Sequence, residues 1–242
     1  MPDPSERKTS QVAALLLKNR GKVVWGWISD GIDRGRANQF LLGCILNYQI
    51  KASKINSIVT EFVATHIKDP SLLWEKITSV PLKDWNDRFR EYHLHRFPKA
   101  HERVWRIGKE IVDQYGGDAS RIWARSTVKE VQDRLDKLRM GEQISHMIVG
   151  ALCDTGQING AGGDVKADRH VTRVVGRVFG GERISPEETI KLTRLMEKEN
   201  PWRLDKPLFD VGKIYCRPTN PKCAECYLRA GCCFAGRHGA GT

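Results

Sequence analysis

The stretch CRPTNPKCAECYLRAGCC at residues 216–233 holds five of the seven cysteines of this 242-residue chain. Four of them follow the spacing C-x6-C-x2-C-x5-C, and these are Cys216, Cys223, Cys226 and Cys232. Cys233 directly follows the last of the four and is interpreted as a spare thiol. So many thiols in so short a segment indicate a bound metal, because thiolate sulfur is a ligand for both zinc and iron–sulfur clusters.

The spacing of these cysteines distinguishes between the kinds of metal centre. A zinc ribbon usually has two close ligand pairs separated by about 12 to 20 residues. Here the single close pair, Cys223 and Cys226, has one further cysteine at short range on each side. Four thiolates without a histidine at this spacing favour a 4Fe–4S cluster. A zinc ion and disulfide bonds stay open as alternatives.

The chain as a whole has a surplus of basic residues. Lys and Arg number 40 against 29 for Asp and Glu, which gives a net charge of +11 and a pI near 9.4. Nucleic acid or an anionic membrane surface is therefore the leading class of partner. The hydrophobic fraction of 40% excludes a disordered tail, and no apolar run reaches the ~18 residues that a membrane-spanning helix requires.

The first ten residues, MPDPSERKTS, lack the apolar core of a secretory signal peptide. We therefore expect a cytoplasmic, nucleoid-associated protein in a reducing compartment, where the cysteines need a use other than disulfides. We also expect a monomer without a membrane partner.

The spacing of apolar residues is helical nearly throughout, and no stretch shows sustained period-two alternation, so an all-α fold is predicted. Gly116 and Gly117 are expected to end one helix. The turn formed by Arg139, Met140 and Gly141 joins two others into a helix–hairpin–helix unit. A glycine-rich loop, GQINGAGGD at residues 156–164, indicates a domain boundary. The predicted helices before this loop cover residues 37–48, 99–115, 128–138 and 144–152.

The segment LFDVGKIYC at residues 208–216, followed by this cysteine spacing, resembles the cluster loop that ends endonuclease III and its adenine-excising relatives. These proteins form part of the helix-hairpin-helix DNA glycosylase superfamily. Further matches follow in order along the chain: LLGCILNYQ at 41–49, FPKAHERVWRIGKEIVDQYGGD at 97–118, the hairpin unit, and KADRHVTRV at 166–174. In that family a helix carrying G-x3-C delivers the first cluster ligand, which Gly212 and Cys216 match here.

The resemblance implies two helical domains. Residues 30–155 would form a six-helix domain with the helix–hairpin–helix motif. Residues 1–29 and 156–242 would form the iron–sulfur cluster domain. The active site would lie in the cleft between them. The partner implied is double-stranded DNA, and the cofactor implied is a 4Fe–4S cluster.

The resemblance also implies the chemistry of a DNA N-glycosylase of base excision repair. Such an enzyme everts a damaged, mismatched or modified base and hydrolyses its bond to deoxyribose. Because the sugar becomes cationic as the base leaves, the site needs an anion near the anomeric carbon. Asp168 stands where the family has its catalytic aspartate. Its structural alternative, a helix N-cap, is compatible with that role.

Bifunctional family members also cut the strand, through a lysine that forms a Schiff base with the sugar. Gln143 takes that lysine's place here, and an amide cannot form an imine, so a monofunctional enzyme is predicted. A lyase that uses another lysine, Lys137 or Lys166, is one alternative. A non-catalytic DNA-binding iron–sulfur protein and a zinc-bound nucleic-acid adaptor are the others.

The resemblance implies further contacts with DNA. Gln49 would fill the space left by the everted nucleotide, and Tyr48 beside it would line the pocket. The residues expected to contact the DNA backbone come from the hairpin and the cysteine loop: Arg139, Met140, Gly141, Arg217 and Lys222.

Gly43 stands where the adenine-excising relatives have a catalytic glutamate, which weighs against adenine as substrate. An open pocket and close helix packing are both compatible with a glycine at this position.

Overall fold

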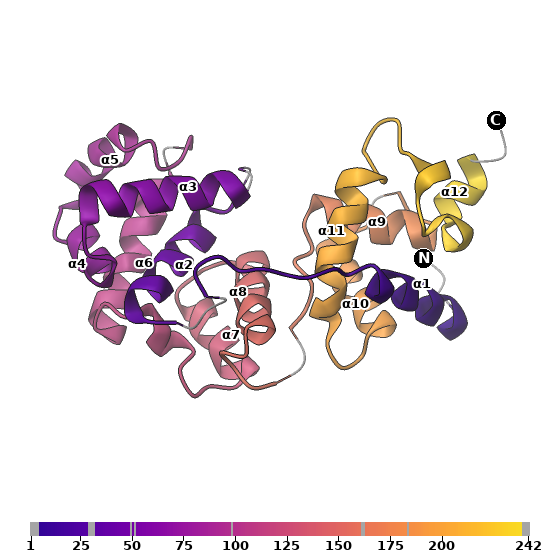
Figure 1. Cartoon of the computed structure of the whole chain (residues 1–242), viewed down its shortest axis with the longest axis horizontal. Helices are drawn as coiled ribbons and strands as arrows, with labels where there is room; N and C mark the ends of the chain where they lie inside the picture. The colour runs from indigo at the N-terminus through magenta and orange to yellow at the C-terminus, as the bar shows by residue number, and fades with distance from the viewer. Residues whose placement is uncertain are drawn as a thin grey trace. The chain divides into compact units, whose positions relative to one another are not determined.

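A computed structural model describes residues 5–28, 32–48, 50, 52–97, 99–160, 163–182 and 184–238. In these residues the regular elements are helices, with one isolated bridge between Thr127 and Asn159, so the predicted all-α fold is confirmed. None of the described helices is both long and apolar enough to cross a membrane. The chain divides into two compact units, residues 24–160 and residues 1–23 with 161–242 (Figure 1).

The unit of residues 24–160 is built around α2 (Figure 1). Most residues of α2 are buried. Inside it, the buried Asn38 donates to the carbonyl of Gly117 at 3.0 Å and accepts from the Trp74 indole and the Ala119 amide, each at 3.0 Å. This buried amide is therefore fully used in joining α2 to its neighbours. The elements are α2 (Arg34–Leu46), α3 (Ala52–Phe62), the π-helical turn η1 (Val63–Ile67), η2 (Pro70–Leu72), α4 (Leu73–Thr78), α5 (Leu82–Glu91), α6 (Ala100–Tyr115), η3 (Ala119–Ile122), α7 (Val128–Lys137) and α8 (Glu142–Asp154).

Local capping signals determine where these helices begin and end. Asp33 accepts a hydrogen bond from the Arg36 amide at 2.8 Å, so α2 begins three residues before the predicted start at 37. Gly116 ends α6 in the left-handed conformation, with φ of 62°, as predicted. A reciprocal capping box between Thr127 and Glu130 begins α7.

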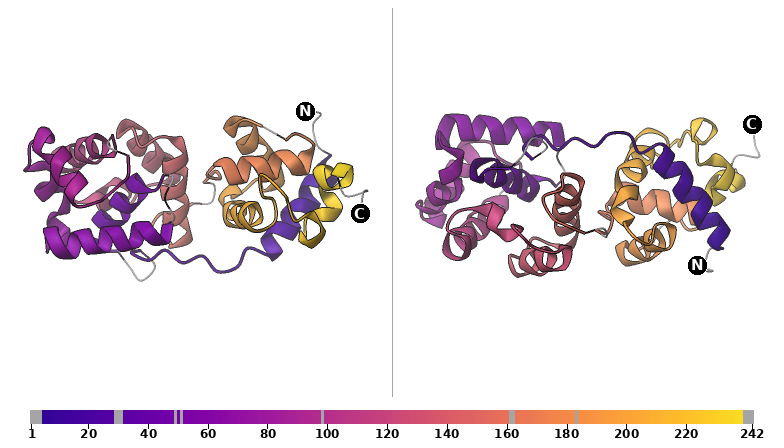
Figure 2. Two further views of the ribbon diagram at one scale, coloured as in Figure 1. Left: turned by 90° about the horizontal axis from the view of Figure 1, so that it is seen from above. Right: turned by 60° about the horizontal axis from the view of Figure 1, so that its bottom comes forward.

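The second unit joins the N-terminal helix to the elements that follow residue 163. Figure 2 shows α1 lying against these later segments in both views. Apolar side chains from α1, α9, α10 and α11 form its core, among them Leu16, Val174, Leu192 and Leu208. Its elements are α1 (Glu6–Lys18), α9 (Arg169–Phe179), α10 (Pro186–Met196), η4 (Pro201–Leu204), α11 (Asp205–Ile214), η5 (Cys223–Glu225), η6 (Arg229–Gly231) and α12 (Cys233–His238).

The glycine of the G-x3-C segment allows α11 to pack closely on α9. A Cβ atom added to Gly212 would lie 2.9 Å from the Cβ and 3.0 Å from the carbonyl oxygen of His170. Backbone atoms cannot swing aside as a flexible side chain can, so a larger residue must push the two helices apart.

We expect Gly212→Ala to lower the free energy of unfolding by about 1 to 3 kcal/mol, because the helices lose this close contact. Denaturant titration measures the change. Gly236→Ala in α12 is the matched control, since a Cβ there meets nothing within 4 Å. Equal losses in the two variants would contradict the packing role of Gly212.

Candidate active site and cysteine centre

Asp168 is the N-cap of α9, as its sequence context predicted. Its Oδ1 accepts hydrogen bonds from the amides of His170 at 2.7 Å and Val171 at 3.1 Å. Its Oδ2 accepts no hydrogen bond from any described residue. The side chain is half-buried at the positive end of the helix dipole. Two amides therefore hold this carboxylate in one orientation, and its second oxygen receives no hydrogen bond from the described residues.

The backbone that leads into Asp168 is fixed to the rest of its unit. The amide of Asp168 donates to the Lys166 carbonyl at 2.6 Å, and the amide of Lys166 donates to Asp205 at the start of α11 at 2.7 Å. Four residues before Asp168, the carboxylate of Asp164 receives two hydrogen bonds from Arg194, at 2.8 and 2.6 Å. Asp164 is therefore part of an ion pair, whereas Asp168 forms no ion pair with any residue that the structure describes.

Arg173 connects α9 to the first cysteine of the loop. Its Nε donates to the carbonyl of Cys216 at 2.7 Å, and its Nη2 donates to the carbonyl of Gly212 at 2.9 Å. The same Nη2 lies 3.2 Å from Nδ1 of His170. The same helix thus carries Asp168 at its N-terminus and Arg173 about one turn later. Through Arg173 it positions the backbone of Cys216.

The hairpin between α7 and α8 is a Schellman turn in which an arginine takes the usual place of glycine. Arg139 is left-handed, with φ of 55°, and its amide donates to Asp136 at 2.8 Å. The amide of Met140 donates to Leu135 at 3.1 Å, and the Met140 side chain is fully buried. The turn itself therefore uses the amide of Met140, and the unit buries its side chain, so the predicted DNA contact of this residue gains no support from its surroundings.

Two arginines of α6, which the sequence analysis did not single out, support this turn. Arg103 donates to the Met140 carbonyl, and Arg106 donates to the Leu138 carbonyl at 3.3 Å. Burial lowers the pKa of Arg103. Guanidinium groups on carbonyls just after α7 interact favourably with the negative end of its dipole. The paired residues are 37 and 32 positions apart in the sequence. Sequence analysis did not find these contacts because they join distant parts of the chain.

Tyr48 follows α2 and belongs to an aromatic cluster. Its ring stacks on His95 with centroids 4.2 Å apart, and on Phe97 with centroids 5.7 Å apart. Nε2 of His95 lies 3.1 Å from the Tyr48 carbonyl, and its Nδ1 accepts from the Phe97 amide at 3.1 Å. Burial raises the pKa of the Tyr48 phenol. The predicted contact residue Gln49 lies outside the described residues.

The indole of Trp27 packs over Gly43 in the middle of α2. A Cβ atom at this position would lie 2.6 Å from Cζ3 and 3.0 Å from Cη2 of the Trp27 ring. Close packing therefore accounts for Gly43, and the packed element is the half-buried tryptophan of the segment before α2.

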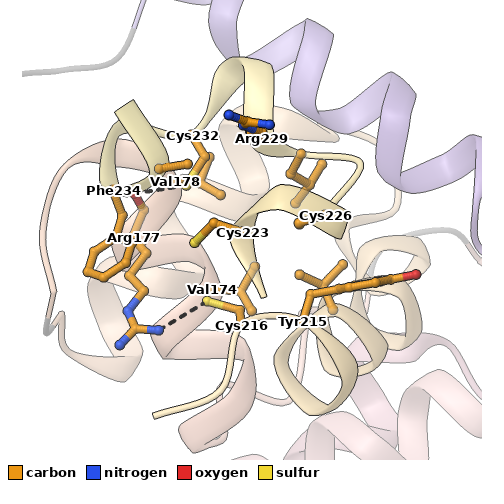
Figure 3. A pocket seen from close by; sticks show the side chains of 13 residues that line it. Val174, Arg177, Val178, Tyr215, Cys216, Cys223, Cys226, Arg229, Cys232 and Phe234 are labelled. Atoms are coloured by element: carbon orange, nitrogen blue, oxygen red, sulfur yellow. Dashed lines mark hydrogen bonds between the residues drawn. The ribbon is translucent and has the colours of Figure 1, made fainter. Parts of the chain in front are cut away.

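The four cysteines predicted as ligands line one pocket, which Figure 3 shows between α9, the end of α11 and the loops that follow. The amide of Lys222 donates to the Tyr215 carbonyl at 2.8 Å and so closes the loop of residues 216–222. Arg217 and Lys222 are exposed on this loop, where Lys222 pairs with Glu225 at 3.2 Å. The loop therefore presents two cations to solvent beside the pocket.

The residues that line this pocket are suited to bind a metal centre through sulfur. In the described part of the chain, no group of three or more His, Cys, Asp or Glu residues is arranged to hold one metal ion. The donor set that lines the pocket is four cysteines without a histidine, which suits a 4Fe–4S core.

The charges around the pocket fit the same group. Burial raises the pKa of the Cys226 thiol to about 11, and neighbouring thiols add to the shift. A bound metal centre would lower the pKa of these thiols and hold them as thiolates. The pocket wall also contains Arg177, which is 8% exposed and whose Nε is buried without a hydrogen-bond partner. Bound thiolates would give this cation an anionic neighbour.

No family model matches the chain. Endonuclease III of Thermotoga maritima is 26% identical over 168 residues, which are 69% of this chain and 71% of that protein. This chain is therefore similar in sequence to endonuclease III, in agreement with the resemblance found from its motifs.

Solved structures show the endonuclease III fold over almost the whole chain. A trapped endonuclease III–DNA covalent intermediate is 18% identical with a TM-score of 0.70, and covers 97% of this chain and 99% of its own. A non-covalent endonuclease III–DNA complex is 17% identical with a TM-score of 0.70, at 97% and 98% coverage. A thermostable thymine-DNA glycosylase is 20% identical with a TM-score of 0.68, at 97% and 100% coverage.

Gln143 lies exposed in the first turn of α8. His146, almost one turn later, is 3% exposed and faces the core. Of the two other candidate lysines, Lys137 is exposed near the end of α7 and Lys166 is half-buried two residues before Asp168. The position that resembles the Schiff-base lysine is thus surface-accessible but carries no amine.

Proposed function

We propose that this chain is a DNA glycosylase of base excision repair that hydrolyses the N-glycosidic bond of an everted base. The observation that carries the proposal is the carboxylate of Asp168. Two amides of α9 orient one of its oxygens, and the other is left open. The likeness to endonuclease III and to a thymine-DNA glycosylase supports this assignment.

The proposed reaction assigns a charge-stabilising role to Asp168. As the bond between C1′ and the base breaks, its electron pair leaves with the base, and positive charge develops on deoxyribose. The negative charge of the carboxylate stabilises that cation. Water then forms the new bond to C1′ and loses a proton, while the departing base gains one. The products are a free base and an abasic site.

The proposed DNA contacts come from the hairpin and from the loop of residues 216–222. The amides of Gly141 and Glu142 begin α8, where a helix has no internal partners for its N–H groups, so they can bind a phosphate. The exposed side chain of Arg139 adds a charge at the same turn. Arg217 and Lys222 would contact the backbone from the second unit.

Two residues after α2 are proposed to act at the everted nucleotide. Gln49 would occupy the vacated place in the duplex, and Tyr48 would line the pocket. Support for Tyr48 is its half-buried ring at the end of α2, held in place by stacking on His95.

We propose that the four cysteines hold a 4Fe–4S cluster, which would cross-link the last segments of the chain. Cys216 follows α11, Cys223 begins η5, Cys226 ends it, and Cys232 follows η6. These short elements depend on the centre for their arrangement, because few buried apolar side chains come from them. Hydrolysis of a glycosidic bond moves no net electrons, so the proposed role of the cluster is structural.

The enzyme is proposed to be monofunctional, because an amide stands at position 143. Gln143→Lys is expected to create an amine that forms an imine with the sugar, and borohydride should then trap a covalent adduct with DNA. Wild-type protein should give no adduct in the same assay. Gln143→Arg is the control that adds charge without a nucleophilic amine. A wild-type adduct would contradict the monofunctional assignment and would indicate another lysine.

A glycosylase screen tests the proposed activity. The substrates are duplexes that carry uracil, thymine mismatches, or oxidised, alkylated or methylated bases, and each sample is divided and half is treated with alkali. Strand breaks that appear only after alkali support a monofunctional glycosylase. Breaks without alkali indicate lyase activity, and no base release from any duplex would overturn the proposed function.

A further inference from the structure

Arg177 is a buried cation in the wall of the cysteine pocket. It lies in the last turn of α9, and Figure 3 shows its side chain beside Cys216. Its Nη1 donates to the Arg217 carbonyl at 2.7 Å and lies 3.5 Å from Sγ of Cys216, and its Nη2 donates to the Pro218 carbonyl at 3.2 Å. The guanidinium stacks over the Phe234 ring at 4.3 Å. One side chain thus contacts a ligand sulfur, two loop carbonyls and an aromatic face.

This guanidinium has no acidic partner in the described part of the chain, although only 8% of the residue is exposed. Its Nε is also buried without a hydrogen bond. A buried charge is costly unless an opposite charge compensates it, and neutral carbonyls and a ring supply only dipoles. Cysteine sulfurs, which can become anionic, line the same pocket, and that of Cys216 lies 3.5 Å from the guanidinium.

We infer that Arg177 is the internal counter-cation of the metal-bound cysteines and that it sets the reduction potential of their cluster. This inference depends on the proposed 4Fe–4S centre, whose core and four thiolates together have a net negative charge. A buried positive charge and an N–H···S hydrogen bond both favour the more reduced state of such a centre.

The same guanidinium ties the centre to the loop that follows Cys216. Arg217 and Pro218, whose carbonyls it binds, begin the loop of residues 216–222. A purely structural role would involve only these two carbonyls. If the charge of Arg177 acts on the cluster, its removal changes the reduction potential of the cluster as well. Measurement of this potential therefore distinguishes the structural role from the charge role.

Arg177→Met and Arg177→Lys in the purified holoprotein test the inference, with Arg229→Met as the matched control. Arg229 lines the same pocket but is exposed, so solvent screens its charge. We expect Arg177→Met to lower the midpoint potential, so that the ratio of reduced to oxidised cluster at a fixed poise falls about tenfold. Arg177→Lys keeps the charge, so its midpoint potential should lie between those of Arg177→Met and wild type. A potential for Arg177→Met equal to that of Arg229→Met would overturn the inference.

The lysine variant also covers the case in which Arg177→Met fails to fold. Arg177→Lys loses the planar fork that joins Cys216 to two carbonyls. Iron loss to a chelator should therefore be faster than in wild type and in Arg229→Met, and equal rates would overturn the inference. Wild-type protein that carries no iron and no acid-labile sulfide would instead overturn the proposed cofactor, and this inference with it.

Discussion

Asp168→Asn is expected to lower the single-turnover rate of base excision by about 10²- to 10³-fold. Removal of one oriented electrostatic group that stabilises a transition state has an effect of this size. Asparagine keeps a side-chain oxygen that can accept from the amides of His170 and Val171, so α9 retains its cap. Only the negative charge is lost. Rapid-quench assays with enzyme in excess measure the rate, and thermal unfolding confirms that the fold is kept.

Asp164→Asn is the control for this variant. It removes a carboxylate four residues earlier in the same connecting segment, where Arg194 already holds both oxygens. Its excision rate should stay within about threefold of wild type. If Asp168→Asn kept the wild-type rate as well, another group would be supplying the negative charge.

Cys226→Ser is expected to remove the iron and acid-labile sulfide from the purified protein and to lower the unfolding temperature by at least about 10 °C. A group that binds only the folded state adds its binding free energy to stability, and this stabilisation disappears with the ligand. For a chain of this size, each kcal/mol corresponds to about 2 to 4 °C. Iron and sulfide analysis, visible absorbance and calorimetry measure the effect.

Cys233→Ser is the matched control for the ligand set. The Cys233 thiol accepts a hydrogen bond from Nζ of Lys8 at 2.9 Å, and a serine oxygen can accept the same bond. This variant should keep its iron and its unfolding temperature. Iron lost from Cys233→Ser but kept by Cys226→Ser would show that the ligands were assigned to the wrong cysteines.

The features predicted correctly from sequence have local causes. Gly116 ends α6 because a glycine takes a left-handed backbone without strain. Asp168 caps α9 through amides only two and three residues away. Helical periodicity likewise reports which face of each helix is buried, and this was sufficient for the all-α fold.

The features missed depend on contacts between residues far apart in the chain. Arg177 meets Cys216 across 39 residues, and Arg103 meets Met140 across 37. From sequence alone an arginine is predicted to lie at the surface, and only the structure shows what surrounds it. Met140 was expected at the DNA surface because of its place in the turn, but the Schellman geometry turns its side chain inward. Trp27 over Gly43 is a third such contact.

The central claim is that the carboxylate of Asp168 stabilises a positive charge on the sugar. The most direct test is to compare binding of two duplexes, one with a cationic pyrrolidine and one with a neutral tetrahydrofuran in place of the target nucleotide. The account predicts that wild-type protein binds the cationic duplex at least about tenfold more tightly, and that Asp168→Asn loses this preference. Equal affinities of wild-type protein for the two duplexes, or an unchanged preference in Asp168→Asn, would contradict it.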